Sequence, residues 1–357
     1  MSEQTYRVVV WGTGSIGKEM LSTIVDHRED LELVGVRVYS AAKDGRDAGE
    51  LIGRPPVGVA ATSDTDAILA LDADCVIYTP LVGDVDEVCA LLASGKNVAT
   101  TVFLFYPPRL PAADRDRLLA ACRQGGTTLH GSGINPGNLS GALPLALSGM
   151  SRTLEKVTLQ ERADMTLYDS TDISFGNMGF GGPLEGIRPD DGGFLADQTS
   201  MFTEQVWLLA DAFKAGIDEV TVEVEAVPAQ QDHQVFDRFL AAGSTAGQRW
   251  RWTGRRDGQA RVEIETLWTV GNEYPGHWPT PEHGWTLTME GDPSMRVHFM
   301  ALASFSRRAS IAEHVQAANV ATAMQVLNAV PAVCEAEPGF ATVATLPLIR
   351  THTGFAG

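Results

Sequence analysis

The 357-residue chain has only five lysines and four cysteines, and it carries no motif that would bind a metal ion. HExxH and G-x-S-x-G are both absent, which excludes the zinc-peptidase and serine-hydrolase signatures, and we expect no metal. The cysteines follow no CxxC or zinc-type spacing, so we expect reduced thiols in a cytoplasmic protein; they are Cys75, Cys89, Cys122 and Cys334.

Positive charge and long apolar runs are scarce as well. Lys and Arg number 27 against 45 Asp and Glu, and the net charge of −18 repels nucleic acid and anionic membranes. The first residues, MSEQTYRVVVWG, pass from a short polar leader into a strand and show no basic region of a signal peptide. No run approaches the roughly 20 apolar residues of a membrane span. We therefore expect neither a nucleic-acid nor a membrane partner.

The first 138 residues alternate strand-like and helix-like segments. YRVVVWG (6–12) and DCVIYTP (74–80) are continuous apolar runs, as expected of strands covered on both faces. DVDEVCALLASGK (84–96) has the pattern of a helix closed by Gly95. This βαβ alternation predicts an α/β fold, with an N-terminal Rossmann domain that contains a doubly wound parallel sheet.

The pattern changes near residue 150, where strands begin to alternate polar with apolar residues, as in TVEVEAV (221–227). Such alternation is typical of an antiparallel sheet with one solvated face. We predict an inserted α+β domain at 139–307 with a mainly antiparallel sheet. A C-terminal helix (310–336) returns to the Rossmann domain, after which the chain ends in loops. The Rossmann domain then comprises 1–138 and 308–357.

The segment VVVWGTGSIGKEM places three glycines in GxGxxG spacing between a strand and a helix. The first permits the tight turn, the second lets the backbone approach a pyrophosphate, and the third lets helix and strand pack closely. The helix N-terminus then offers N–H groups and a positive dipole end to the phosphates. We infer dinucleotide binding; glycines that serve only a tight turn are the alternative. The cofactor-binding loop comprises Gly12, Thr13, Gly14, Ser15, Ile16 and Gly17.

The end of the second strand, VGVRVYSAAKDGRD, bears on the choice of cofactor. NAD sites usually carry an Asp or Glu about 20 residues beyond the loop, where it holds the ribose hydroxyls. This strand has no acid at its tip, and Ser40 with nearby Lys43 could hold a 2′-phosphate, so we expect NADP in preference to NAD. Solvated loop charges at Lys43 and Arg46 are the alternative.

Further cofactor contacts are expected where the other strands end, because ligands bind at the carboxyl edge of such sheets. Thr79 and Pro80 end one strand, and Thr101 ends the next. Asn135, in GSGINPGN (131–138), offers both a donor and an acceptor to the cofactor or the substrate.

Five segments together resemble the dihydrodipicolinate-reductase-like oxidoreductases: VVWGTGSIGKEML, LVGVRVYSAAKDGRDAGEL, DCVIYTP, GINPGN and MGFGGPL. Within that group, the chain is similar to 2,4-diaminopentanoate dehydrogenase and the native amine dehydrogenases, and GRDAGEL and VFLFYPP resemble an actinobacterial branch. The resemblance spans essentially the whole chain. It implies a Rossmann domain, an inserted substrate domain that also drives oligomerisation, and NAD(P)-dependent hydride transfer to a C=O or C=N carbon.

One stretch departs from this family. The amine dehydrogenases carry a glutamate just after the Thr-Thr strand end, where it handles the amine and its proton, and this chain has Phe103 and Leu104 there. An apolar wall cannot stabilise an ammonium or iminium by charge pairing, which argues against reductive amination with ammonia but not against hydride transfer. We predict that Phe103, Leu104 and Phe105 form one wall of an apolar substrate pocket; core packing between domains is the alternative for Phe103 and Phe105.

The proton donor is then expected in the inserted domain, within hydrogen-bond reach of the substrate heteroatom. Tyr168 is the first candidate, because a phenol can donate in a dry site, and an interface tyrosine is the alternative. The stretch 163–186 also holds a loop rich in glycine and methionine that could exclude water. The candidate catalytic residues are Tyr168, Asn135 and Asp164, and the candidate substrate contacts are Asn177 and Met178, with Asp169 and Asp172 in the same stretch.

These observations favour an NAD(P)H-dependent oxidoreductase that acts on a small, largely apolar carbonyl, imine or amine. The alternatives are an amine dehydrogenase that uses another carboxylate and a non-catalytic NADP-binding sensor. The glycine-rich loop favours an enzyme, since a sensor needs no lid over a substrate. Trp250 and Trp252 share one strand face, where they would pack the helix 199–216 or a partner subunit, and the resemblance implies a homodimer.

Overall fold

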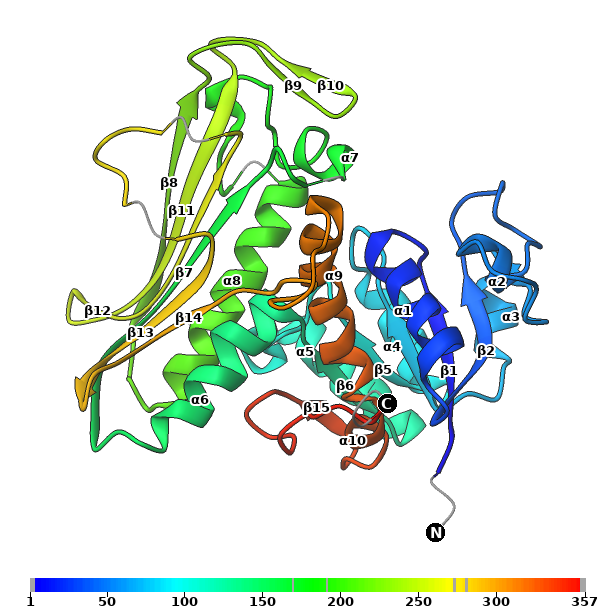
Figure 1. The fold of residues 1–357 in the computed structure, drawn as a ribbon. Helices are drawn as coiled ribbons and strands as arrows, with labels where there is room; N and C mark the ends of the chain where they lie inside the picture. Colours follow the sequence, from blue (N-terminus) through cyan, green and yellow to red (C-terminus); the bar gives the residue numbers. More distant parts are fainter. Residues whose placement is uncertain (1–3, 169, 191, 272–273, 280–281, 354–357) are drawn as a thin grey trace. The chain divides into compact units, whose positions relative to one another are not determined.

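The protein is described from a computed structural model of the chain, which covers residues 4–168, 170–190, 192–271, 274–279 and 282–353. The chain divides into two compact units (Figure 1). Unit 1 comprises 1–138 and 319–357, and unit 2 comprises 139–318. The second segment of unit 1 therefore begins at 319, whereas the sequence analysis began it at 308.

Unit 1 is built around a parallel sheet. Within the described residues, its strand order is β15-β6-β5-β4-β1-β2-β3, and each neighbouring pair is parallel. The order reverses at β1, which pairs with both β2 and β4, so the doubly wound Rossmann sheet is confirmed. The strands are β1 (Tyr6–Trp11), β2 (Leu31–Arg37), β3 (Ala61–Thr62), β4 (Cys75–Tyr78), β5 (Asn97–Thr100), β6 (Thr128–Gly131) and β15 (Gly339–Ala341).

Two apolar clusters cover the two faces of this sheet. Successive side chains of β1 point to opposite faces of the sheet, so Val8 and Val10 belong to one cluster and Val9 and Trp11 to the other. All four side chains are fully buried. The prediction that the chain ends in loops was wrong, because β15 adds a short strand beside β6. The helices of this unit before residue 138 are α1 (Ser15–His27), α2 (Ala48–Leu51), α3 (Thr65–Leu69), α4 (Val85–Ala93) and α5 (Ala112–Gly125).

Unit 2 holds a mixed sheet with the strand order β14-β13-β7-β12-β11-β8 in its described part, and a small pair, β9 and β10. β7 and β12 pair in parallel, while the other neighbours in the large sheet are antiparallel, as the alternating pattern predicted. The strands are β7 (Thr153–Asp164), β8 (Glu219–Pro228), β9 (His233–Val235), β10 (Arg238–Leu240), β11 (Thr245–Arg256), β12 (Gln259–Thr269), β13 (Gly284–Asp292) and β14 (Met295–Phe299).

One long helix, α8 (Gly193–Ala212), covers a face of the unit 2 sheet (Figure 1). Trp252 stacks on Phe202 of this helix at a centroid distance of 4.3 Å, and Trp250 stacks on Trp252 at 5.8 Å. Packing against this helix is therefore confirmed for Trp252. Within the described residues, the α-helices that lie wholly in this unit are α6 (Leu143–Ser148), α7 (Thr171–Ser174) and α8 (Gly193–Ala212).

The predicted C-terminal helix is two helices, α9 (Ile311–Leu327) and α10 (Val330–Cys334), and Pro331 lies in the first turn of α10. By length and composition, the described segment Ile311–Cys334 would suffice to cross a membrane, although the sequence analysis recognised no such run. Ala323, Val326 and Leu327 pack in the core of unit 1, as the residues of a core helix do.

Candidate active site

The glycine loop joins β1 to α1. Gly12 has a φ of +99°, which favours glycine, and a Cβ atom there would lie 2.7 Å from the carbonyl oxygen of Thr79. A Cβ on Gly17 would lie 2.1 Å from the carbonyl oxygen of Gly12. Packing alone therefore excludes any side chain at these two positions.

Gly14 is a glycine for a different reason. A Cβ there would meet nothing within 4 Å, so the backbone faces open space. Gly14 caps α1 without a side chain, whereas α3 and α4 are capped by Asp64 and Asp84, whose carboxylates accept backbone N–H groups. The first turn of α1 also contains no acid. Its N–H groups and positive dipole end fit the pyrophosphate of a dinucleotide.

Cations gather beside this loop. The Nζ atom of Lys43 donates to the carbonyl oxygen and the hydroxyl of Thr13, both at 3.0 Å. Burial lowers the pKa of Lys43, and the positive charges of Lys18 and Arg46 lower it further. Three cations thus share one neighbourhood with the exposed Ser40, and this geometry fits a phosphate group on the adenosine ribose.

An aromatic and acidic network at the same edge was missed by the sequence analysis. The Arg37 guanidinium lies 5.3 Å from the ring of Trp11 and 5.0 Å from that of Tyr39. The Trp11 indole donates to the Tyr39 hydroxyl at 2.9 Å, and Glu87 accepts from the hydroxyls of Tyr39 at 3.3 Å and Tyr78 at 2.6 Å. Burial raises the pKa of Tyr78, so its phenol remains a donor. Glu87 lies on α4, more than forty residues beyond the end of β2 in the chain. The sequence around β2 therefore gave no signal for this carboxylate.

The other predicted cofactor residues lie at or just beyond the ends of strands in unit 1. Thr79 ties β4 to β1, because its N–H and hydroxyl donate to the carbonyl oxygen of Trp11 at 2.8 and 3.1 Å. Pro80 is buried, and Thr101 is partly buried directly after β5. Asn135 follows β6 and forms a cis peptide bond with Pro136. These positions agree with a cofactor edge.

The apolar stretch after β5 contributes to the core of unit 1. Leu104 is 1% exposed and belongs to the cluster that contains Tyr78, and the ring of Phe103 lies 6.0 Å from that of Tyr78. Phe105 is also buried. Core packing thus accounts for the apolar character of Leu104 without any ligand, and the pocket wall stays a prediction.

The predicted residues of unit 2 lie at and beyond the carboxyl end of β7, which Asp164 ends. Asp164 holds a turn, because its Oδ1 atom accepts from the N–H and hydroxyl of Thr166 and from the N–H of Gly271 at 2.7–3.1 Å. Tyr168 follows this turn and is partly buried, while Asp169 lies outside the described residues. Asn177 donates from its side-chain amide to the carbonyl oxygen of Asp172 at 2.8 Å. Met178 is buried, and its carbonyl oxygen accepts from the Gln248 amide at 2.7 Å.

The sequence analysis missed Glu161, three residues before Asp164. Its two carboxylate oxygens accept from the indole N–H groups of Trp268 and Trp285, each at 2.7 Å. The three residues belong to three strands, so only the sheet register brings them together. Within the described part of the chain, no group of three or more His, Cys, Asp or Glu side chains could hold a metal ion.

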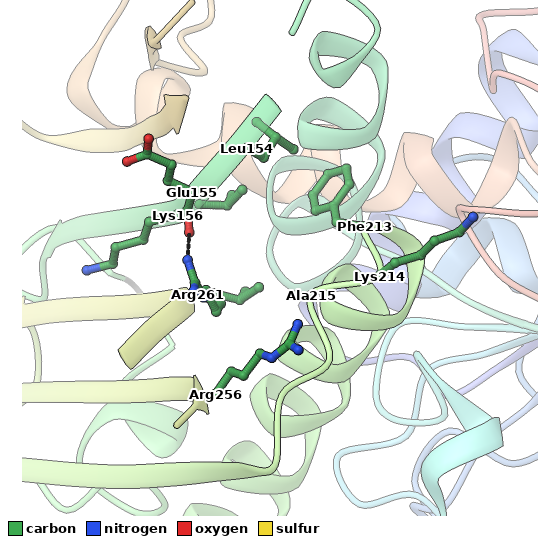
Figure 2. Close-up of a pocket in the computed structure, with 10 residues that line it drawn as sticks. Leu154, Glu155, Lys156, Phe213, Lys214, Ala215, Arg256 and Arg261 are labelled. Atoms are coloured by element: carbon green, nitrogen blue, oxygen red, sulfur yellow. Dashed lines mark hydrogen bonds between the residues drawn. The ribbon is translucent and has the colours of Figure 1, made fainter. Parts of the chain in front are cut away.

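A cavity of about 260 Å³ lies at the opposite end of the unit 2 sheet (Figure 2). Arg261 donates to the carbonyl oxygen of Glu155 there at 3.2 Å, and Arg256 lies beside the segment that follows α8. The β7 residues that line this cavity are seven to ten positions from Asp164, or roughly 23–33 Å along an extended strand. The cavity is therefore separate from the candidate catalytic residues.

Comparison with known protein families assigns the chain. A family model for the 2,4-diaminopentanoate dehydrogenase C-terminal domain matches residues 142–356, more than half of the chain. The chain belongs to this family. A second model, for the dihydrodipicolinate reductase N-terminus, matches residues 6–99, where the glycine loop lies. The resemblance inferred from the sequence is confirmed.

Relatives of this family member match along nearly their whole length. An amine dehydrogenase from Streptomyces virginiae is 29% identical, over 95% of this chain and 96% of the relative. A 2,4-diaminopentanoate dehydrogenase from Acetoanaerobium sticklandii is 22% identical, over 98% and 95%. An amine dehydrogenase structure from Mycobacterium smegmatis shares the fold, with a TM-score of 0.78, 20% identity and 98% coverage of both chains. The protein is therefore an NAD(P)-dependent oxidoreductase, as the sequence predicted.

Proposed function

We propose that this protein is an amine dehydrogenase that prefers NADP and interconverts a small, largely apolar amine with the corresponding carbonyl compound. The observation that carries the proposal is the phosphate cradle at Gly12, Gly14 and Gly17, in a chain that aligns from end to end with an amine dehydrogenase. In balanced form, an alkylammonium ion, NADP⁺ and water give a carbonyl compound, ammonium, NADPH and a proton.

The residues of unit 1 bind and orient the cofactor in this proposal. The first turn of α1 binds the pyrophosphate, while Thr79, Pro80, Thr101 and Asn135 line the nicotinamide end. When bound, the nicotinamide accepts a hydride from the carbon that bears nitrogen, or returns it. Preference for NADP is supported by Lys43, Lys18 and Arg46 beside Ser40, since cations favour a 2′-phosphate.

The residues of unit 2 handle the substrate and its proton. Tyr168 is the proposed proton donor, and Asn177 is proposed to orient the reacting group. Asp164 serves mainly to hold the turn that presents Tyr168, because three hydrogen bonds already engage one of its oxygens. Met178 is proposed to contact the apolar part of the substrate, while the wall predicted at Phe103 and Phe105 belongs to unit 1. Unit 1 is thus the dinucleotide domain and unit 2 the substrate and oligomerisation domain.

We further propose that the protein works as a cytoplasmic homodimer with neither a nucleic-acid nor a membrane partner. The net charge of −18 supports this by repelling polyanions. The apolar α9 is consistent with it, because the second half of the helix packs in the unit 1 core. Sedimentation of the purified protein with and without NADP⁺ would test the dimer.

The proposed function is tested by measuring NADPH and NADH binding by fluorescence and then cofactor oxidation with ketones and aldehydes, with and without ammonia. We expect ammonia-dependent turnover and tighter binding of NADPH. Turnover that is independent of ammonia would make the protein a carbonyl reductase instead. Tight cofactor binding without turnover of any ketone or aldehyde would favour a redox sensor. Failure to bind either NADPH or NADH would overturn the assignment of the glycine loop.

A further inference from the structure

The cavity in unit 2 lies where three segments of the chain meet (Figure 2). The first residues of β7, the hairpin between β11 and β12, and the residues that follow α8 each contribute to its walls. All three segments belong to one compact unit, so the cavity is formed within unit 2.

Hydrogen bonds hold two of these segments together. The chain leaves α8 through Lys214, whose left-handed backbone has a φ of +54°. Asp218 then ties this segment to the β11–β12 hairpin. Its N–H donates to the carbonyl oxygen of Arg255 at 2.7 Å, and its carboxylate accepts from the N–H of Asp257 at 2.9 Å. The fold therefore shapes the cavity before any ligand binds, which reduces the ordering that binding requires.

Apolar side chains form one part of the lining. Val157 of β7 and Val262 of β12 are register partners and are 3% and 1% exposed. Leu154, Phe213 and Ala215 complete this apolar part. Such side chains favour a ligand that buries hydrocarbon against them.

Two arginines form a second part of the lining. In Figure 2, the guanidinium groups of Arg256 and Arg261 lie between the strand ends and the segment that follows α8. A Cβ atom on Gly216 would lie 3.3 Å from Nη1 of Arg256, so this guanidinium packs closely on that segment. The side chains of Lys156 and Lys214 point away from each other in the same view, and neither ammonium group lies beside the two arginines.

The positive charge of the two guanidinium groups is only partly balanced. Arg261 donates to the carbonyl oxygen of Glu155 at 3.2 Å and to the side-chain oxygen of Gln259 at 3.3 Å, and both acceptors are neutral. Arg256 lies 3.9 Å from a carboxylate oxygen of Asp257, and solvent weakens this pair because the side chains are 53% and 92% exposed. The carboxylate of Glu155 points away from both arginines (Figure 2).

The two guanidinium groups also keep hydrogen-bonding capacity. A guanidinium has five N–H donors in a planar fork, and Arg261 uses one on each of its two terminal nitrogens. The other cation–anion pair of the lining, Lys156 with Glu263 at 3.2 Å, is balanced within itself. An anion in the cavity would thus meet the two arginines.

We propose that this cavity is a second ligand site, which binds a small carboxylate that carries a short hydrocarbon chain. The planar guanidinium groups of Arg256 and Arg261 bind the carboxylate through charge-assisted hydrogen bonds, and the apolar part of the lining contacts the chain. The volume of about 260 Å³ is below the roughly 300–1,000 Å³ of sites for drug-sized ligands, so the ligand is small. The inference is independent of the proposed function, because the cavity is separate from the candidate catalytic residues.

Calorimetric titration of the whole protein with hexanoate is the first test. We expect saturable binding that is at least about tenfold tighter than that of hexan-1-ol or hexylammonium at equal ionic strength, because only the anion pairs with guanidinium. Acetate should bind at least about tenfold more weakly than hexanoate, since it has no chain to bury. Absence of saturable hexanoate binding overturns the proposal, and so does phosphate binding that is as tight as that of hexanoate.

Substitutions then locate the bound carboxylate. Arg256→Gln and Arg261→Gln should each weaken hexanoate binding about tenfold, because each removes a charged donor. Arg251→Gln is the matched control, since Arg251 belongs to the same strand as Arg256 but pairs with Glu223 and lies outside the lining. It removes the same charge from the protein and should leave hexanoate affinity within about twofold of the wild type.

Arg256→Gln keeps the test decisive if Arg261→Gln folds poorly, because the Arg256 side chain is half exposed. Unchanged hexanoate affinity in a folded Arg256→Gln protein overturns the proposal, as does equal weakening in the Arg251→Gln control. The measurement needs neither cofactor nor turnover. A protein that fails to turn over any amine or ketone therefore contradicts the proposed function and still tests this site.

Discussion

The cofactor loop of unit 1 and the cluster of Glu161, Trp268 and Trp285 in unit 2 are assembled in contrasting ways. Gly12, Gly14 and Gly17 lie within six consecutive residues, and they act through the backbone and the start of a helix. Glu161 and its two tryptophans are separated by more than a hundred residues and meet only through the register of three strands. A site made by backbone geometry has a local sequence signature, whereas a site made by side chains across a sheet has none.

The largest effect is expected from Gly17→Ala, which tests whether backbone packing makes the loop. The new Cβ would meet the carbonyl oxygen of Gly12 at 2.1 Å, so the turn must move. We expect a loss of roughly 3 kcal/mol of stability and at least a hundredfold weaker NADPH binding. Gly14→Ala is the matched control, because its Cβ meets nothing, and it should weaken NADPH binding while leaving the melting temperature unchanged. Equal destabilisation by the two substitutions would contradict the conclusion that backbone packing requires glycine at position 17 but not at position 14.

Phe202→Ala addresses the core of unit 2. Phe202 is 3% exposed and stacks on Trp252, so its removal should cost about 3–5 kcal/mol of unfolding free energy, measured by urea titration. NADPH affinity of the folded protein should not change, because the loop lies in unit 1. Phe305→Ala is the control in the same unit, at a position 78% exposed, and should shift stability by less than about 0.5 kcal/mol. A large change in NADPH affinity would show that the cofactor site depends on this core.

His130 predicts how the stability of unit 1 responds to acid. It is 1% exposed on β6, its Nδ1 atom lies 2.9 Å from the carbonyl oxygen of Ala341, and burial lowers its pKa to about 4. In the unfolded chain His130 takes up a proton below about pH 6.5, whereas in the folded protein it stays neutral down to about pH 4. The contribution of the neutral, buried His130 to the free energy of unfolding is therefore fully present above pH 6.5. It declines by about 1.4 kcal/mol per pH unit down to about pH 4, a total of roughly 3 kcal/mol. His130→Gln should remove that slope; parallel pH profiles for the two proteins would contradict the prediction.

The smallest effect is expected for Lys43→Met, which tests how much the charge of Lys43 contributes to NADPH binding. Removing the cation that contacts Thr13 should weaken NADPH binding about tenfold, because a charge-assisted contact to the 2′-phosphate is lost. NADH binding to the same variant is the internal control and should change by less than about twofold. Equal weakening for both cofactors would assign Lys43 to the loop structure instead of the phosphate.

Much of unit 1 could be predicted because its signals are local. Continuous apolar runs marked β1 and β4, and the glycine spacing marked the start of α1. The short strand β15 escaped prediction because Gly339–Ala341 is held by pairing with β6 and has no pattern of its own. Leu104 was expected at a pocket wall, since an apolar side chain suits a pocket and a core equally well, and only burial showed its place in the core cluster.

In unit 2, the sequence predicted which segments form strands and helices, but not which side chains these segments bring into contact. Trp250 and Trp252 were expected to share a face from the period of two, and the stacking on Phe202 agrees. The acid that the sequence singled out was Asp164, in the stretch 163–186 that also holds Tyr168. The structure engages Asp164 in a turn and instead presents Glu161 between two indoles.

The sequence by itself determined the Rossmann topology, the dinucleotide loop and the family, because hydrophobic period and glycine spacing are properties of neighbouring residues. Tertiary structure alone decided which acid meets which tryptophans, which cations surround Lys43, and which aromatic residues belong to the core. Those outcomes depend on strand register and on loops that meet in space, and a shift of one residue in β7 would have turned Glu161 to the opposite face.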